Sequence, residues 1–480
     1  MKADMFINRE EELSYLNTVW NSNQAELIIV WGRRRIGKTR LLMEFSKNKR
    51  SLYLYVYHAS SSSLLNFFTK EIMRQLNVKF PTGYAFPDWN AFFEYLVQLA
   101  EEEKLLVIID EFQRLADVSP EAIELLQYWW DKKLKRTKIK LVLVGSSIGM
   151  IEKVALSGSG PLYGRKTGLL SVKSMGFFDF IRAFNHLDTI KLIELYAIFG
   201  GTPHYFMMID PNKSVEDNII EKIASPYAPL RDEPEQLLRT ELRSLAIYMD
   251  ILEKMARGYS ISVGDIASSL NKSRSEIYPY LIRLEKMDII SREYRPTDKV
   301  MEYRRARFKI TDNYIRFWFN FIYPNYSEIE RGNVEAVLGS YKREKNRYIS
   351  HVYEEIVNEY LLRFSGRTFK DALNRVIRLP KIHKTGRWWW KDTEIDICAV
   401  AENTIILGEV KWREQSITER EINELLTRKT RIFLQRTGVE KMIEYLIATK
   451  RMPKGNVIDL IKHFRIILIL PSTLITQNNQ

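Results

Sequence analysis

The chain has 480 residues, of which 45% are hydrophobic and 28% charged, and its formal charge at pH 7 is +13. This length exceeds one ordinary hydrophobic core, so we expect two to four domains. The positive charge favours a polyanionic partner, with nucleic acid as the leading candidate. Cys398 is the only cysteine, which excludes an internal disulfide and a cysteine zinc cluster. Acids near the start and the lack of a long apolar run predict a cytoplasmic protein with no membrane partner.

A strand and a helix are predicted within residues 27–45, LIIVWGRRRIGKTRLLMEF. Between them, GRRRIGKT fits G-x-x-x-x-G-K-[ST] in full, in the strand-to-helix context that a phosphate-binding P-loop needs. Lys38 is expected to reach the β- and γ-phosphates of ATP, and Thr39 to ligate Mg²⁺. The residues predicted to surround the nucleotide are Gly32, Arg33, Arg34, Arg35, Ile36, Gly37, Lys38, Thr39 and Arg40.

Residues 105–112, LLVIIDEF, predict a buried parallel strand that ends in two acids. Asp110 is expected to hold Mg²⁺ and Glu111 to polarise the attacking water. A further buried strand at 140–147, KLVLVGSS, ends in Ser146 and Ser147, one of which could sense the γ-phosphate. Serines after strands are often turn residues instead.

Six segments in this part of the chain carry a family resemblance. FINREEEL, GRRRIGKT, VIIDEF, LVGSS, GPLYGRKTG and IFGGTP, in this order, resemble the archaeal-type AAA+ ATPases related to the STAND branch, over about residues 5–210. The resemblance implies that Arg9 lies near the nucleotide base, that the turn at 200–203 opens a helical lid, and that Arg165 serves as an arginine finger. From the sequence alone, Arg165 fits a solvated surface charge equally well. A homo-oligomer is left open as the assembly.

Residues 260–295 predict a helix-turn-helix followed by a wing. The second helix is expected at 275–287. Residues 271–310 hold eleven Lys and Arg against six acids, which suits a winged helix that reads DNA with Arg274 and Ser275. An internal lid or a protein contact fits the same pattern.

The segment EIDICAVAENTIILGEVKW at 394–412 predicts a β-hairpin with its turn at 402–403. Residues whose numbers sum to 805 then face each other, which places Asp396 opposite Glu409. The alternation of side chains puts Lys411 on the same, ionic face and apolar residues on the other. Opposed carboxylates repel unless water, the lysine or a cation neutralises them, so a divalent metal is the hypothesis to test.

The segment 363–391 ahead of this hairpin is strongly basic, with nine Lys and Arg against the single acid Asp371. Basic residues and three tryptophans occur together there. This combination suits contact with phosphates and stacking on the bases of nucleic acid, although one or two of the tryptophans are expected in the core.

The order of predicted elements in the last domain, α-β-β-β-α-β, and the D…E-x-K spacing resemble the PD-(D/E)xK nuclease superfamily over about residues 346–470. The resemblance implies that Asp396 and Glu409 ligate Mg²⁺ and that Lys411 positions or activates the attacking water. It also implies that Glu354 supports the metal from the first helix. Two other interpretations stay open: a cross-strand ion pair on a surface hairpin, and a nuclease fold that only binds nucleic acid.

The predicted fold class is α/β, with a P-loop parallel sheet, a helical lid, a winged helix-turn-helix and a restriction-endonuclease-like domain. The predicted function is an ATP-binding and ATP-hydrolysing protein that acts on nucleic acid, with DNA preferred, through a Mg²⁺-dependent nuclease site gated by the nucleotide. The alternative is a STAND-like switch whose last domain binds DNA without cleaving it. The expected divisions are the ATPase core at 1–200, the lid at 201–245, the winged helix at 246–310, an aromatic connector at 311–345 and the nuclease-like domain at 346–480.

Overall fold

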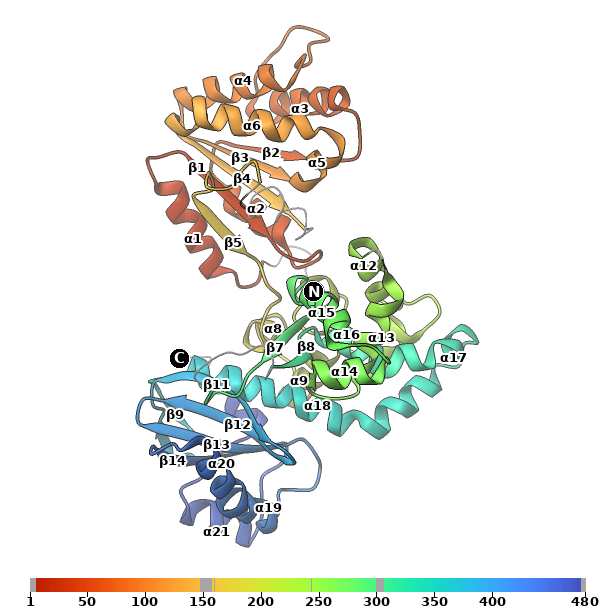
Figure 1. Ribbon diagram of the computed structural model, residues 1–480, viewed down its shortest axis with the longest axis vertical. Helices are drawn as coiled ribbons and strands as arrows, with labels where there is room; N and C mark the ends of the chain where they lie inside the picture. Colours follow the sequence, from red (N-terminus) through yellow and green to blue (C-terminus); the bar gives the residue numbers. More distant parts are fainter. Residues whose placement is uncertain (1–5, 147–157, 159, 243, 299–305, 476–480) are drawn as a thin grey trace. The chain divides into compact units, whose positions relative to one another are not determined.

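The computed structural model of the protein divides into two compact units (Figure 1). The first comprises residues 1–174 with the short segment 286–288, and the second the remainder of the chain. No helix in the described part of the chain is both long and apolar enough to cross a bilayer. The described residues are 6–146, 158, 160–242, 244–298 and 306–475.

The first unit is built on a five-stranded parallel sheet with the strand order β2-β3-β4-β1-β5. Strands β3 and β4 are buried along their whole length, as expected for parallel strands covered on both faces. The strand, loop and helix predicted around residues 27–45 are confirmed. The strands are β1 (Glu26–Trp31), β2 (Ser51–Tyr55), β3 (Leu105–Asp110), β4 (Ile139–Gly145) and β5 (Gly168–Ser171).

Helices cover both faces of this sheet (Figure 1). One core cluster gathers apolar residues of α1 and α2 against the sheet, and a second gathers those of α3, α4 and α6. The helices are α1 (Glu10–Asn21), α2 (Lys38–Ser46), α3 (Ser61–Leu76), α4 (Trp89–Glu102), η1 (Phe112–Arg114), α5 (Leu115–Val118), α6 (Pro120–Lys132) and η2 (Leu134–Arg136).

The second unit begins with a group of helices and continues into a small three-stranded sheet with the order β6-β8-β7. The helix predicted at 275–287 is confirmed within one residue at each end. The elements are α8 (Phe177–Ala183), α9 (Thr189–Phe199), α10 (Pro203–Phe206), α11 (Val215–Ile219), η4 (Ile220–Ala224), α12 (Glu233–Glu241), α13 (Leu245–Ala256), β6 (Ile261–Ser262), α14 (Val263–Ser269), α15 (Arg274–Lys286), β7 (Ile290–Glu293) and β8 (Arg307–Ile310).

An aromatic segment follows, and it is buried, because Tyr314, Phe317 and Trp318 expose no surface. The next helix, α18, has 29 residues and runs without a break through positions 345–346, where a domain division was expected. One rigid element therefore links the aromatic segment to the last domain. The elements are α16 (Asn313–Phe317), η6 (Trp318–Ile322), η7 (Tyr323–Asn325), α17 (Tyr326–Glu330) and α18 (Glu335–Arg363).

The last part of the second unit is a mixed sheet with the order β11-β12-β13-β14-β15. The pairs β11–β12 and β12–β13 are antiparallel, whereas β13–β14 and β14–β15 are parallel. The predicted element order was incomplete, since β14 and α21 stand between the expected helix and the final strand. Parallel neighbours need a crossover, which the helices after β13 supply. The strands are β9 (Thr368–Lys370), β10 (Val376–Arg378), β11 (Ile382–Trp390), β12 (Thr393–Ala401), β13 (Thr404–Lys411), β14 (Met442–Thr449) and β15 (Ile467–Ile469).

The predicted hairpin register is confirmed, with Ile397 paired to Gly408 and the turn at 402–403. The predicted ionic face is wrong for most of its length. Cys398 and Leu407, which share that alternation, are fully buried in the core cluster. The hairpin is buried on both faces because α18 and η8 both pack on its strands. The helices of this part are α19 (Glu419–Glu424), η8 (Leu425–Lys429), α20 (Thr430–Thr437), α21 (Asn456–His463) and α22 (Pro471–Ile475).

Candidate functional site

The loop between β1 and α2 has the backbone that the glycine pattern requires. Gly32 has φ +153°, and a Cβ at this position would lie 2.3 Å from the carbonyl oxygen of Val172. Gly37 caps α2 in the left-handed conformation with φ 89°. Both positions therefore exclude ordinary side chains. Of the arginines in and after this loop, Arg33 is buried, Arg34 is half-buried, and Arg35 and Arg40 are exposed.

Lys38 and Thr39 are the first two residues of α2, and their side chains contact different parts of the site. The Lys38 ammonium is buried and donates to the carbonyl oxygens of Gly32 at 2.8 Å and Arg33 at 2.9 Å. The Thr39 hydroxyl donates to the Asp110 carboxylate at 2.9 Å. The loop after β1 and the acid at the end of β3 thus meet at the carboxyl-terminal ends of the strands, although β4 lies between these two strands.

Asp110 and Glu111 follow each other but have different partners. Asp110 also accepts a hydrogen bond from the Tyr53 hydroxyl at 2.5 Å, and burial together with this carboxylate raises the pKa of Tyr53. Glu111 has φ 54°, and this left-handed turn directs its carboxylate to the end of β4. There Ser146 donates to it at 3.1 Å, and the amide of Gln113 donates at 2.8 Å. Ser147 lies outside the described residues.

Gln113 is a site residue that the sequence analysis missed. Its amide nitrogen lies between Glu111 at 2.8 Å and the Ser146 hydroxyl at 3.3 Å, and its side chain is buried. Arg114 adds a weaker contact, 3.3 Å from Glu111. In the sequence, the only signal for this role was a polar residue two positions after Glu111. Its burial next to Ser146 in the structure shows that it holds the Glu111 carboxylate.

Arg9 supports the phosphate loop from the start of α1. Its guanidinium donates to the carbonyl oxygens of Ile36 at 3.0 Å and Lys173 at 2.7 Å, and it pairs with Glu12 at 2.7 Å. Arg9 therefore connects the loop to the chain that follows β5. This contact with the loop backbone gives Arg9 a local role in positioning the loop.

Arg165 lies near the amino-terminal ends of the strands of the same sheet, opposite the ends that carry the phosphate loop. It pairs with Asp131 at the end of α6 at 2.7 Å, just ahead of β5. Thr167 donates its backbone N–H to Leu27, which is at the start of β1. All five strands run in the same direction, so their amino-terminal ends lie about 20 Å, the length of β1, from the phosphate loop. Arg165 cannot reach the nucleotide site of its own chain.

A second group of predicted site residues occurs in the mixed sheet of the second unit. Strand β12 has one more residue than β11 between the pairs Gly386–Cys398 and Trp388–Ile395. Asp396 lies in this bulge. Bulges locally disrupt the ladder and redirect a side chain. The redirected carboxylate is buried.

Asp396, Glu409 and Lys411 come together as predicted. Asp396 accepts the backbone N–H of Val410 at 3.0 Å and lies 3.4 Å from the Lys411 ammonium. Glu409 is 2.9 Å from Lys411 through one oxygen and 2.5 Å from Lys429 through the other. The two carboxylates therefore share one lysine. Lys429, at the end of η8, is a partner that the sequence analysis did not identify.

Glu354 approaches the same cluster from α18. It is buried, and its Oε2 lies 3.4 Å from Arg387 Nε without a hydrogen bond to any described residue. Burial and the charge of Asp396 raise the pKa of Glu354 well above its usual value. Burial also raises the pKa of Asp396, but Lys411 and Arg387 outweigh this effect and hold it below its usual value. Burial and Asp396 raise the pKa of Glu409.

Arg387 is not the phosphate contact that its place in the basic segment suggested. Its guanidinium is buried and lies 2.8 Å from Glu394 and 3.9 Å from Asp396. The predicted hairpin register, in which the numbers of paired residues sum to 805, also places Glu394 opposite Lys411. Neither expectation allowed for the carboxylates on either side of Arg387, which neutralise its charge.

The three tryptophans of the basic segment are already in contact with other side chains. Trp388 is in the core and packs on Phe433, with ring centroids 5.2 Å apart. Trp389 lies under Arg307 at 4.8 Å and Trp390 under Arg436 at 4.5 Å. In this arrangement none of them is an open stacking platform for a base.

The carboxylates of the cluster suit Mg²⁺ chemically, since hard oxygen ligands are those it prefers. In the part of the chain that the structure describes, however, no group of three or more His, Cys, Asp or Glu side chains is arranged to hold a metal. Lys411, Lys429 and Arg387 lie beside the carboxylates and offset part of their charge. A pocket of about 320 Å³ opens beside the cluster and is lined by Glu354, Asp396 and Lys411, among others.

The parallel sheet, the glycine loop after β1 and the acids after β3 define a P-loop nucleoside triphosphatase. Residues 6–209 match a family model described as an ATPase domain predominantly from Archaea. The chain is 34% identical over 438 residues to the uncharacterized protein MJECL04 of Methanocaldococcus jannaschii, covering 89% of this chain and 92% of that protein. The chain belongs to this family of P-loop ATPases, whose members in general bind ATP with Mg²⁺.

Other similarities agree with this family. A stretch of 46 residues is 56% identical to the uncharacterized ATP-binding protein MJ0423 of the same organism, covering 10% of this chain and 78% of that protein. The Walker-type ATPase PABY2304 of Pyrococcus abyssi has a TM-score of 0.50 and 20% identity, covering 66% of this chain and 97% of that chain, which supports the fold alone. Residues 318–425 match a model described as "Archaea bacterial proteins of unknown function". The resemblance to P-loop ATPases is thus confirmed, whereas the nuclease resemblance stays a prediction.

Proposed function

We propose that the chain hydrolyses ATP at the carboxyl-terminal ends of the strands of the first sheet, with Mg²⁺ held by Thr39 and Asp110. The observation that supports this proposal is the 2.9 Å contact between these two side chains. A hydroxyl from the loop and a carboxylate from the buried strand are the protein ligands of Mg²⁺ in P-loop enzymes. Bound Mg²⁺ would neutralise charge on the phosphates.

Three further residues complete the assignment. Lys38 faces the phosphates, Glu111 orients the attacking water, and Ser146 senses the γ-phosphate through Glu111. The hydrogen bond of 3.1 Å from Ser146 to Glu111 supports this coupling, because a phosphate that recruits the serine releases the carboxylate. Arg9 contributes by holding the loop backbone at Ile36.

The test is ATP hydrolysis by the full chain with and without Mg²⁺. Lys38→Ala should abolish tight ATP binding because it removes the cation that faces the β- and γ-phosphates. Lys47→Ala is the matched control, since Lys47 follows the other end of α2 and its side chain is 64% exposed. Equal hydrolysis by both variants would contradict the assignment.

We also propose that the second unit acts on nucleic acid through a winged helix and a restriction-endonuclease-like domain. The α14–α15 pair with β7 and β8 supports the winged helix, and Arg274 and Ser275 are exposed at the start of α15. Exposed basic residues on β10 and β11 and just before β11 offer a surface for phosphates: Arg378, Lys381 and Lys384. The five-part domain division is proposed with its last boundary inside α18, which links the aromatic connector to the last domain.

Metal-dependent cleavage of DNA, gated by the nucleotide, is our proposal for the cluster around Asp396. The convergence of Asp396, Glu409 and Lys411 beside a pocket supports it. The second candidate is a regulator that binds DNA without cleaving it. The ion pairs of Glu409 with two lysines favour this candidate, because they already occupy its oxygens.

A plasmid-nicking assay with Mg²⁺, with and without ATP, separates the two candidates. Cleavage that disappears in Asp396→Asn and Lys411→Ala supports the nuclease. Asp392→Asn is the control, since Asp392 is an exposed acid in the turn before β12. DNA binding without nicking in any variant supports the regulator.

A further inference from the structure

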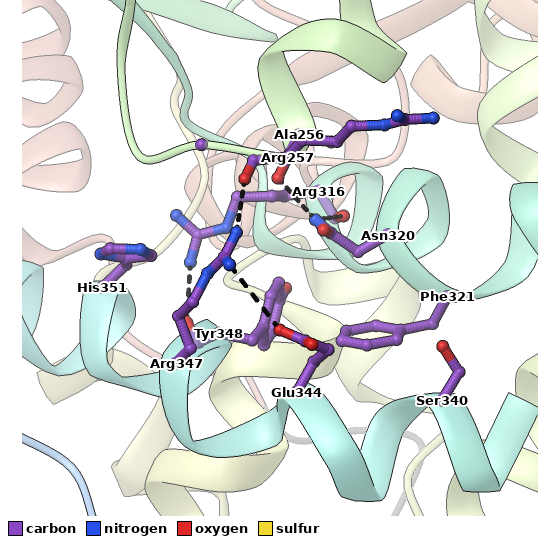
Figure 2. Close-up of a pocket in the computed structure, with 11 residues that line it drawn as sticks. Ala256, Arg257, Arg316, Asn320, Phe321, Ser340, Glu344, Arg347, Tyr348 and His351 are labelled. Atoms are coloured by element: carbon purple, nitrogen blue, oxygen red, sulfur yellow. Dashed lines mark hydrogen bonds and ion pairs between the residues drawn. The ribbon is translucent and has the colours of Figure 1, made fainter.

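A second pocket of the second unit, of about 250 Å³, is not explained by ATP hydrolysis or by the carboxylate cluster (Figure 2). It lies between the end of α13, the aromatic segment and the first half of α18. Its polar lining includes Arg316, Asn320, Ser340, Glu344, Arg347 and His351, and Arg257 and Tyr348 also line it.

Arg316 is the unusual residue of this pocket. It is 2% exposed, and its Nε and Nη1 have no hydrogen-bond partner in the described part of the chain. Its Nη2 lies 3.5 Å from the carbonyl oxygen of Tyr348, and the guanidinium stands over the Tyr348 ring at 4.9 Å. Unsatisfied donors on a buried cation are costly, so a ligand that accepts from them would be strongly favoured.

The neighbouring carboxylates leave this charge largely unbalanced. Glu355, whose charge acts on Arg316, is itself ion-paired with Lys309 at 2.9 Å. Glu344 is the acid in the pocket lining, and it lies 3.9 Å from Arg347. The pocket is therefore positive, with the guanidinium groups of Arg316 and Arg347 opposed by one carboxylate.

Arg347 is the second cation of the pocket and is well placed for a ligand. It donates to the carbonyl oxygen of Arg257 at 2.8 Å, while its side chain stays 67% exposed. Figure 2 shows that the Arg257 side chain itself points away from the pocket, where it pairs with Glu253. His351 adds no charge, because burial, Arg316 and Arg387 lower its pKa to about 3.

We propose that this pocket binds a phosphoryl group, with oxygens that accept hydrogen bonds from Arg316 and Arg347. A phosphoryl group presents three acceptor oxygens, which suits two guanidinium groups better than the two coplanar oxygens of a carboxylate do. Asn320 and Ser340 line the same space and offer further polar contacts. The volume is below that of ordinary small-molecule sites, so it fits one phosphoryl group with a small attached part rather than a nucleoside triphosphate.

A phosphoryl group can come from a free phosphate monoester or from a nucleic-acid backbone. The pocket shares Arg347 and His351 with the pocket beside Asp396, so a backbone bound at the cluster could extend into it. The backbone source rests on the proposed action on nucleic acid. Binding of free phosphate does not depend on that action.

The experiment uses the full chain with Lys38→Ala, which weakens phosphate binding at the first unit. Inorganic phosphate and adenosine monophosphate are titrated by calorimetry into this protein and into versions that also carry Arg347→Ala or Arg343→Ala. Arg347→Ala should weaken binding about tenfold or more, the effect of losing charge-assisted hydrogen bonds. Arg343→Ala removes the same charge from an exposed residue of α18 outside the pocket lining and should change the affinity less than about twofold.

Arg316→Gln is the second variant, with its fold checked by circular dichroism, and a folded Arg316→Gln protein should lose phosphate binding as well. Equal affinities of Arg347→Ala and Arg343→Ala, or phosphate binding absent from the parent, would overturn the proposal. A short single-stranded DNA distinguishes the sources: if Arg347→Ala weakens DNA binding too, the backbone is a ligand, and if it affects phosphate alone, the ligand is a free phosphate compound. Phosphate binding without nuclease activity would leave this site standing while the cleavage proposal fails.

Discussion

The Thr39 hydroxyl donates to the Asp110 carboxylate over 2.9 Å, although 71 residues separate the two in the chain. The contact forms because β1, β4 and β3 are parallel neighbours in that order, so the loop after β1 and the acid after β3 lie at the same ends of the strands. Ser146, at the same end of β4, likewise contacts Glu111. Catalytic predictions for the first unit follow from these contacts.

Glu111→Gln should bind ATP about as tightly as the parent but lose hydrolysis by about 100-fold or more, the usual effect of removing a catalytic base. Calorimetric binding and single-turnover phosphate release measure the two effects separately. Asp117→Asn, an exposed acid of α5, is the control and should retain activity. Hydrolysis at the parental rate in Glu111→Gln would show that another group orients the water.

Arg165 can act as an arginine finger only on a neighbouring copy, because it lies at the far edge of its own sheet. Arg165→Ala and Glu111→Gln should each be inactive, and a mixture of the two should recover part of the hydrolysis if the finger works between copies. The recovered rate should rise with protein concentration. A fully active Arg165→Ala protein would show that Arg165 has no role in hydrolysis beyond its ion pair with Asp131.

Lys429→Gln separates a metal site from an ion-pair cluster, because Lys429 lies 2.5 Å from Glu409. In a Lys38→Ala background, we expect millimolar Mg²⁺ to raise the melting temperature of Lys429→Gln more than that of the parent, since the cluster gains negative charge. Without Mg²⁺ the variant should lose about 1–3 kcal/mol, the cost of a less compensated buried carboxylate. Arg428→Gln, whose partner is the surface residue Glu424, is the control. No added Mg²⁺ effect would reject the metal site.

Glu359 predicts a pH dependence of stability in the second unit. Its carboxylate accepts the backbone N–H groups of Phe177 and Phe178, and burial raises its pKa to about 7. The unfolded chain releases this proton near pH 4.5, so between pH 4.5 and 7 the native state binds more protons and the free energy of unfolding falls as pH rises. Below pH 4.5 the contribution is fully present, and above pH 7 the decline ends.

Glu359→Gln should flatten that decline, as measured by denaturant unfolding between pH 5 and 8. Glu335→Gln, at the exposed start of the same helix, serves as the control and should keep the parental profile. A Glu359→Gln profile parallel to that of the parent would assign the pH dependence to other groups.

The exposed basic residues Arg378, Lys381 and Lys384 predict a steep salt dependence of nucleic-acid affinity. Replacing each with Ala should flatten the slope of log affinity against log salt by about one per phosphate contact. Lys462→Ala, an exposed lysine of α21, should leave the slope unchanged. An affinity that does not respond to salt would rule out this surface.

The local pattern of the sequence was sufficient for the phosphate loop and for the hairpin register. GRRRIGKT places glycines at positions 32 and 37, where φ is positive, which is a local requirement, and at Gly32 the close approach of Val172 adds a tertiary one. The turn at 402–403 and the alternation of side chains set the pairing of Ile397 with Gly408, since a slip of one residue would exchange the two faces.

The tertiary structure decided which charges meet. Lys429 and Arg387 reach Glu409 and Asp396 from other elements and offset part of their charge, which the hairpin pattern did not predict. The position of β14 between β13 and β15 was likewise not predicted, because it depends on neighbours distant in sequence. Arg316 gave no signal within its aromatic segment, and only the packing of α18 left its donors unsatisfied beside a pocket. Charge pairing inside a protein depends on distance and burial, which a one-dimensional pattern does not contain.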